Sequence, residues 1–219
     1  MFTTKVKGIA QIAFWLSMTV VVIALSHVNV VPLFGVHQKS LSLASVLMPL
    51  AGVLVSWVAP FIAGGRSFIA FALTGSYWSF GLYLPGLFGA LAWRSKNIVI
   101  HCVVPLACMF LFIMHTQGAG APLYTTYWLI PVALWFVGRN SLLERALAST
   151  FVAHAIGSVV WLYAYSIPSH VWHSLIPVVF FERLLFALAL VSVYKTAHII
   201  VATLQFYRGR RLLKGWNAH

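Results

Sequence analysis

Apolar residues run along almost the whole chain, in blocks as long as a membrane-crossing helix. About 20 consecutive apolar residues form a helix that crosses the ~30 Å hydrocarbon core of a bilayer. The pattern predicts such crossings at residues 9–25, 43–62, 97–114, 123–137, 146–165 and 175–202. We therefore expect an all-α, polytopic membrane protein of about six transmembrane helices, with residues 1–219 forming a single integral membrane domain.

Residues 67–93 interrupt this regular pattern. Arg66 precedes the segment and Arg94 and Lys96 follow it, so both of its ends should stay on the cytoplasmic side. About 27 residues are too few for two crossings of ~20 residues each. One crossing against the charge rule or a broken, re-entrant excursion would fit. The helix-breaking residues of the segment favour the second: Gly75, Gly81, Pro85, Gly86 and Gly89.

Composition and charge narrow the class of protein and its orientation. Hydrophobic residues make up 62% of the chain and charged residues 7%, which excludes an ordinary soluble domain. The formal net charge of +12 comes from basic residues between the blocks and near the C-terminus, as in cytoplasmic loops. We expect a multi-pass protein of the prokaryotic cytoplasmic (inner) membrane with both termini cytoplasmic, loops 115–122 and 166–174 external, lipid as a partner and no nucleic acid.

Glu182 is the residue that most needs an explanation. The chain has only two acidic residues, and the other, Glu144, completes an S-x-x-E capping box with Ser141 at a predicted helix start. Glu182 lies inside an apolar block, about 10 Å from the outer end of its predicted helix. A carboxylate costs ~2.5–3.5 kcal/mol at the centre of a membrane helix, so it normally faces a cavity or a partner. We therefore predict a substrate-binding role for Glu182.

Other polar and aromatic residues should reach the same depth. His154, Ser158, Trp161 and Tyr165 form one helical stripe, although a helix–helix hydrogen bond explains His154 equally well. Arg183 should pair only loosely with Glu182, because adjacent helical side chains point ~100° apart, and could reach a ligand or a carbonyl instead. The predicted substrate-binding set is Thr74, Tyr77, Trp78, His154, Ser158, Trp161, Glu182 and Arg183, whereas Tyr124, Tyr127 and Trp128 are better explained as interfacial anchors.

The first predicted external loop is long and partly apolar. It runs from His27 to Ser42, and its segment from Val30 to Lys39 could fold over a pocket as a lid that includes Pro32, Phe34 and Gly35. Cys102 and Cys108 fall in one apolar block, so we expect packing residues and no disulfide between them.

The sequence carries no catalytic or metal-binding signature. It lacks a zinc-protease motif, a nucleophile elbow, a phosphate-binding loop and cysteine–histidine sets at zinc spacing, so we expect no enzyme, no cofactor and no metal. Nine histidines nevertheless suggest an alternative. His101 and His198 both lie near the cytoplasmic side and could face each other as axial ligands, which would indicate a haem- or quinone-binding anchor subunit of a redox complex.

Several short motifs are similar to those of one transporter family. Pro60-Phe61-Ile62-Ala63-Gly64-Gly65-Arg66 resembles the P-x-x-A-G-G-x stretch of biotin-type substrate-binding (S) components of energy-coupling factor transporters. The family's glycine-rich motif and its last two helices have counterparts at Thr74-Gly75-Ser76-Tyr77, Gly81, Gly89, Gly157, Trp161-Leu162, Ile176-Pro177 and Glu182-Arg183.

This resemblance implies a function and a set of partners. It implies a six-helix subunit that binds a small vitamin-like molecule for uptake, together with a transmembrane scaffold subunit and a pair of ATPases. A carrier that works alone also fits the sequence. Ala72-Leu73 and Ser76 depart from the family motif, which leaves the substrate open between biotin and a related molecule.

Overall fold

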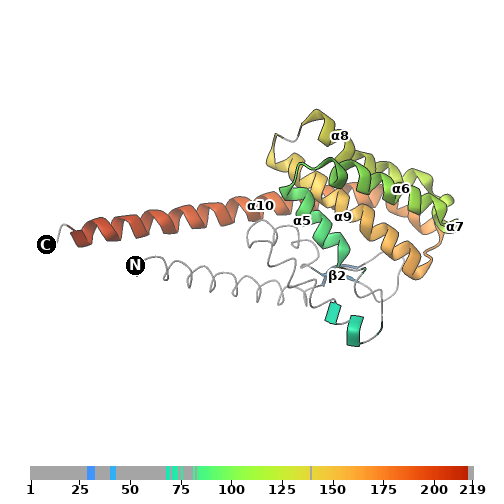
Figure 1. Cartoon of the computed structure of the whole chain (residues 1–219), viewed down its shortest axis with the longest axis horizontal. Helices are drawn as coiled ribbons and strands as arrows, with labels where there is room; N and C mark the ends of the chain where they lie inside the picture. The colour runs from blue at the N-terminus through green and yellow to red at the C-terminus, as the bar shows by residue number, and fades with distance from the viewer. Residues whose placement is uncertain are drawn as a thin grey trace.

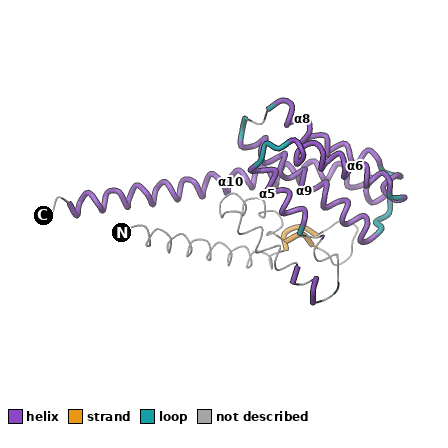
Figure 2. Tube along the Cα trace, in the orientation of Figure 1, coloured by secondary structure: helices purple, strands orange, loops and turns teal. Residues whose placement is uncertain are grey.

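The computed structural model describes residues 29–32, 40–42, 68–69, 71–73, 75, 81, 83–138 and 140–216, and the side chains of most of these. The described part is a helical bundle with one two-stranded hairpin (Figures 1 and 2). The helices are α5 (Leu84–Arg94), η1 (Val99–Val103), α6 (Val104–Met114), α7 (Thr116–Ala119), η2 (Pro122–Trp128), α8 (Leu129–Val137), α9 (Leu142–Tyr165) and α10 (Ser169–Trp216). The predicted helical class is confirmed for this part of the chain.

Helix α9 is the centre of the bundle and packs against α5, α6, α8 and α10. Its start is fixed by the predicted capping box, which is confirmed. The Glu144 N–H donates to Ser141 Oγ over 3.2 Å, and Glu144 Oε2 accepts from the backbone N–H groups of Asn140 and Ser141 at 2.8 and 2.9 Å. These bonds satisfy N–H groups that a helix start otherwise leaves unpaired.

Small residues bring α5 and α9 close together. Ser149, on α9, donates from Oγ to the Gly89 carbonyl of α5 over 2.7 Å. A Cβ placed on Gly157 would lie 3.5 Å from Pro85 Cγ, an ordinary contact distance. Such close backbone approach is typical of helix pairs in membranes. With 11 residues, α5 is about 16 Å long and too short to cross a bilayer by itself.

Two described helices are long and apolar enough to cross a membrane, over Leu142–Tyr165 and Ser169–Ile200. Val99–Met114 and Pro122–Val137 are apolar but shorter. The described residues therefore show fewer candidate crossings than the six predicted. The predicted crossings at 9–25 and 43–62 lie outside the described residues, as does most of segment 67–82, so the break in that segment stays a prediction.

Prolines divide the two shorter apolar stretches into different helix types. Pro105 has no N–H to donate to the His101 carbonyl and would clash with it, so the preceding turn widens into the π-helix η1, in which Val104 N–H donates to the Val99 carbonyl. Pro122 begins the 3₁₀-helix η2, and Pro131 stands in the first turn of α8. A 3₁₀-helix rises ~2.0 Å per residue, so η2 and α8 together extend about 27 Å.

Helix α10 begins earlier than the sequence predicts. The turn after α9 covers only Ser166 to Pro168, with Ser166 in the left-handed region at φ 46°, so the predicted external loop 166–174 is wrong in its second half. Glu182 consequently lies 13 residues into its helix, about 20 Å from the end and not 10 Å. The helix has 48 residues and extends beyond the bundle towards the C-terminus (Figure 1).

The loops sort into two ends of the bundle. At one end, Ser169 donates from Oγ to the Gln117 carbonyl over 2.7 Å, which joins the uncharged loop 115–121 to the start of α10. At the other end, Trp135 Nε1 donates to the Lys96 carbonyl and Arg145 donates to the Trp93 carbonyl. The uncharged loops thus lie together, away from the basic ones, as the charge rule predicts. The membrane side of each end stays a prediction.

Two smaller expectations concern the cysteines and the first loop. Cys102 and Cys108 are buried and unbridged, which confirms their predicted packing role. Strands β1 (Asn29–Pro32) and β2 (Ser40–Ser42) pair antiparallel, with Pro32 opposite Ser40 and an irregularity between Asn29 and Val31. Pro32 therefore belongs to a strand. Phe34 and Gly35 lie outside the described residues, and the lid stays a prediction.

Candidate functional site

Tyr124 stands at the centre of an aromatic cluster between η2, α6 and α10. Its ring stacks on Phe112 with centroids 5.6 Å apart and meets Trp172 edge-on at 4.8 Å and Trp128 at 6.2 Å. Tyr124 is 1% exposed and Trp128 is fully buried. The prediction that Tyr124 and Trp128 are interfacial anchors is therefore wrong, because the 3₁₀-helix turns both side chains into the core.

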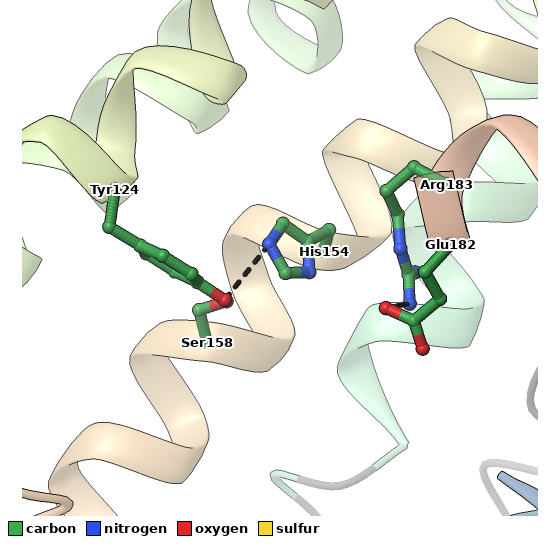
Figure 3. A network of polar contacts seen from close by, with 5 residues as sticks. All are labelled: Tyr124, His154, Ser158, Glu182 and Arg183. Atoms are coloured by element: carbon green, nitrogen blue, oxygen red, sulfur yellow. Dashed lines mark hydrogen bonds and ion pairs between the residues drawn. The ribbon is translucent and has the colours of Figure 1, made fainter. Parts of the chain in front are cut away.

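The Tyr124 hydroxyl joins the first two residues of the predicted stripe on α9. It lies 3.1 Å from His154 Nε2 and 3.3 Å from Ser158 Oγ, which are one helical turn apart (Figure 3). The predicted proximity of His154 and Ser158 to one another is confirmed. The group that they share is the hydroxyl of Tyr124, which the sequence predicted to be an interfacial anchor. Three polar side chains thus form a connected network inside the bundle.

Glu182 and Arg183 form a direct ion pair on α10. Arg183 Nη2 lies 2.8 Å from Glu182 Oε2, so the expectation of only loose pairing is wrong. Both side chains are long enough to bend back towards each other although their Cβ atoms diverge. Arg183 is 9% exposed, and its guanidinium lies over the Phe186 ring at 4.5 Å. Among the described residues, Glu182 has no hydrogen bond or ion pair except this one within its own helix.

The ion pair and the tyrosine network belong to one site. In Figure 3 the His154 ring lies between the Tyr124 hydroxyl and the Arg183 side chain. The site therefore combines groups from η2, α9 and α10, at about the middle of the bundle.

Two buried hydrogen-bond donors in this site have no acceptor among the described residues. These are Arg183 Nε and Trp128 Nε1. A buried donor without a partner costs about 1–3 kcal/mol, and more when it is charged. His154 and Glu182 keep some accessible surface, in contrast to their buried neighbours Ala155, Ser158 and Arg183. The arrangement can bind a polar ligand, and the described residues contain no group of three metal-ligating side chains.

The remaining predicted site residues have different outcomes. The rings of Trp161 and Tyr165 are tilted against each other with centroids 4.9 Å apart, near the C-terminal end of α9. Thr74, Tyr77 and Trp78 lie outside the described residues, so their contribution stays a prediction. Sequence reasoning missed Tyr124 and Trp128 as site residues. Spacing gave no signal for them, because a 3₁₀-helix has about three residues per turn and residues four apart do not share a face. Their burial comes from tertiary packing.

The histidines of the redox alternative lie in different surroundings. His101 is fully buried in η1, with Nε2 2.9 Å from the Ser95 carbonyl oxygen. His198 is exposed on α10, and its ring centroid lies 6.2 Å from that of Tyr194. A shared haem between these two residues stays a prediction.

No protein-family model, curated protein or solved structure matches the chain.

Proposed function

We propose that the chain is the membrane-embedded substrate-binding subunit of an uptake system for a small vitamin-like molecule, biotin or a related compound. It would be a multi-pass protein of the cytoplasmic membrane that works with a scaffold subunit and an ATPase pair, or alone. The observation that carries the proposal is the buried polar site of Tyr124, His154, Ser158, Glu182 and Arg183 within an apolar bundle.

Two physical arguments support a binding role for this site. Ionisable residues inside a membrane helix are costly, and they occur where a ligand, an ion or a partner repays the cost. Glu182 makes no hydrogen bond or ion pair that joins two described helices, so a purely structural role leaves its position unexplained. Aromatic walls with a few placed polar groups are also the usual lining of a small-ligand site.

Mass spectrometry of retained ligand tests the proposal most directly. The full chain, purified in mild detergent, should carry a small molecule that denaturation releases. The same preparation of Glu182→Gln should carry much less of it, whereas Glu144→Gln, which changes the only other acid of the chain, should retain it. A Glu182→Gln protein that is folded and carries the same amount of the same molecule contradicts the proposal.

The absorption spectrum of the same preparation addresses the redox alternative. A haem-binding anchor subunit would show a Soret band, and a quinone would appear among the extracted molecules. Either result in place of a water-soluble ligand would replace the uptake function with that of an anchor for a redox complex.

A further inference from the structure

In the Glu182–Arg183 pair, Arg183 has N–H groups left to donate and Glu182 has an oxygen left to accept a hydrogen bond. A guanidinium has five N–H donors, and the described contacts of Arg183 use one of its nitrogens, Nη2, on Glu182. Its Nε is buried without an acceptor among the described residues. Glu182 uses Oε2 in the pair, and with its side chain 18% exposed it can accept a further hydrogen bond at Oε1. A ligand that bridges the pair needs an acceptor for Arg183 beside a donor for Glu182.

A second unsatisfied donor lies near His154. Trp128 Nε1 is fully enclosed without an acceptor in the described part of the chain, and the Trp128 ring centroid is 6.5 Å from that of His154. Buried donors in folded proteins nearly always have a partner, so two of them around one histidine need an explanation. Trp128 is fully enclosed, whereas the Arg183 side chain is 11% exposed, so a ligand acceptor would pair with Arg183.

The charges of Arg183 and Glu182 indicate whether the ligand group that binds beside them is anionic or uncharged. Arg183 and Glu182 already neutralise each other at 2.8 Å. A ligand carboxylate would add a negative charge next to Glu182 and leave the buried site with a net charge that nothing compensates. A ligand cation would in turn compete with Arg183 for Glu182. An uncharged group that carries both a carbonyl and an N–H avoids both penalties.

We propose that the site binds the carboxamide-type group of its ligand, with the ligand carbonyl accepting from Arg183 and the ligand N–H donating to Glu182. The proposal rests on the substrate-binding function proposed above and specifies the chemical class of the group that is bound. Primary carboxamides and lactams both have this pattern.

Two compounds of the same shape test the proposal on the full chain in lipid nanodiscs. Cyclohexanecarboxamide and cyclohexanecarboxylate differ in charge at neutral pH, and neither absorbs where tryptophan does. Binding is followed by tryptophan fluorescence, because Trp128 and Trp172 lie in the site, with empty nanodiscs as the correction for partition into lipid. We expect the carboxamide to bind at least about tenfold more tightly than the carboxylate.

The variant Glu182→Gln should reverse this preference. It keeps the shape of the side chain but leaves Arg183 with an uncompensated positive charge, so the carboxylate becomes the better ligand. Glu144→Gln is the matched control and should keep the wild-type preference, since the described hydrogen bonds of Glu144 all lie at the start of α9, away from the site. Circular dichroism checks that both variants are folded.

The possible outcomes separate the two proposals. Equal affinity for the two compounds, tighter binding of the carboxylate by the wild type, or an unchanged preference in Glu182→Gln overturns the carboxamide assignment and leaves a binding site in place. Failure of both compounds to bind to the wild type and to Glu182→Gln overturns the assignment, and an empty preparation in the mass-spectrometric test would then overturn the binding function as well.

Discussion

The Tyr124 hydroxyl is the contact that joins η2 to α9 at the level of the site. Tyr124→Phe keeps the aromatic packing but leaves His154 Nε2 and Ser158 Oγ without their shared partner. We expect a loss of about 1–3 kcal/mol in the free energy of unfolding, as for other buried polar groups left unsatisfied. Tyr163→Phe, which removes a hydrogen bond from an exposed hydroxyl to the Leu111 carbonyl, should cost less. Thermal unfolding in detergent measures both, and equal losses would contradict the prediction.

Glu182 is the residue whose replacement best separates binding from stability. Glu182→Gln removes the charge, and because a charge-assisted hydrogen bond contributes ~1.5–3 kcal/mol, ligand affinity should fall roughly ten- to a hundredfold. Glu182→Leu should weaken binding at least as much without impairing insertion, since leucine is favoured in lipid. Ligand titration and thermal unfolding of both variants test this. A folded Glu182→Gln protein with unchanged affinity would show that the carboxylate does not contact the ligand.

At the scale of elements, glycines determine how closely the connecting loop approaches the helices. A Cβ on Gly118 would overlap the Phe112 carbonyl oxygen, which is backbone and cannot turn aside, whereas a Cβ on Gly157 would make an ordinary contact with Pro85. Gly118→Ala should therefore destabilise the bundle by about 1–3 kcal/mol. Gly157→Ala should be neutral or stabilising by up to ~1 kcal/mol, because alanine is the better helix former. Thermal unfolding compares the two, and a stable Gly118→Ala protein would contradict the described turn.

The proline of α10 sits next to a second contact between elements. Pro177 removes one N–H from the helix just above Glu182, and the Tyr127 hydroxyl donates to the neighbouring Ile176 carbonyl over 2.7 Å. The part of α10 that precedes Pro177 is thus bonded to η2. The part that follows Pro177 carries Glu182 and Arg183. Tyr127, expected to be an interfacial anchor, instead fixes the upper part of this helix.

For the whole molecule, the dimensions of the bundle agree with those of a bilayer. Tyr194 meets Trp93 at the basic end, with ring centroids 5.8 Å apart, and the helix from Ser169 to Tyr194 is ~37 Å long at ~1.5 Å per residue. The hydrocarbon core is ~30 Å thick. A bundle of this height can place its uncharged and basic ends in opposite interfacial regions.

The grouping of the loops gives a topology that labelling can test. Because the uncharged loops share one end of the bundle, single cysteines at the exposed positions Ala119 and His170 should both react with an impermeant maleimide added to intact cells. A cysteine at Asn140 should react only after permeabilisation. The background for these variants lacks Cys102 and Cys108, which are buried and unpaired. Labelling of Asn140 from outside, with protection of Ala119, would invert the proposed orientation.

The hydrophobic pattern by itself determined much of the architecture. It predicted the helical class, the helix from Ala146 to Tyr165 and the separation of uncharged from basic loops, while the capping box placed the start of α9. These features depend on neighbours in the chain: a run of apolar side chains, a serine three residues before a glutamate, a proline without an N–H. Sequence reasoning also selected His154, Ser158, Glu182 and Arg183 from spacing and charge.

Only the tertiary structure decided which groups meet. Tyr124 looked like an interfacial anchor because aromatic residues near loops usually are, but η2 turns it inward onto residues 30 and 34 positions further along the chain. The depth of Glu182 also changed, because a polar-looking stretch continued α10 instead of forming a loop. Contacts between distant segments depend on packing, in which the burial of a whole side chain outweighs the small local preferences that a sequence pattern reports.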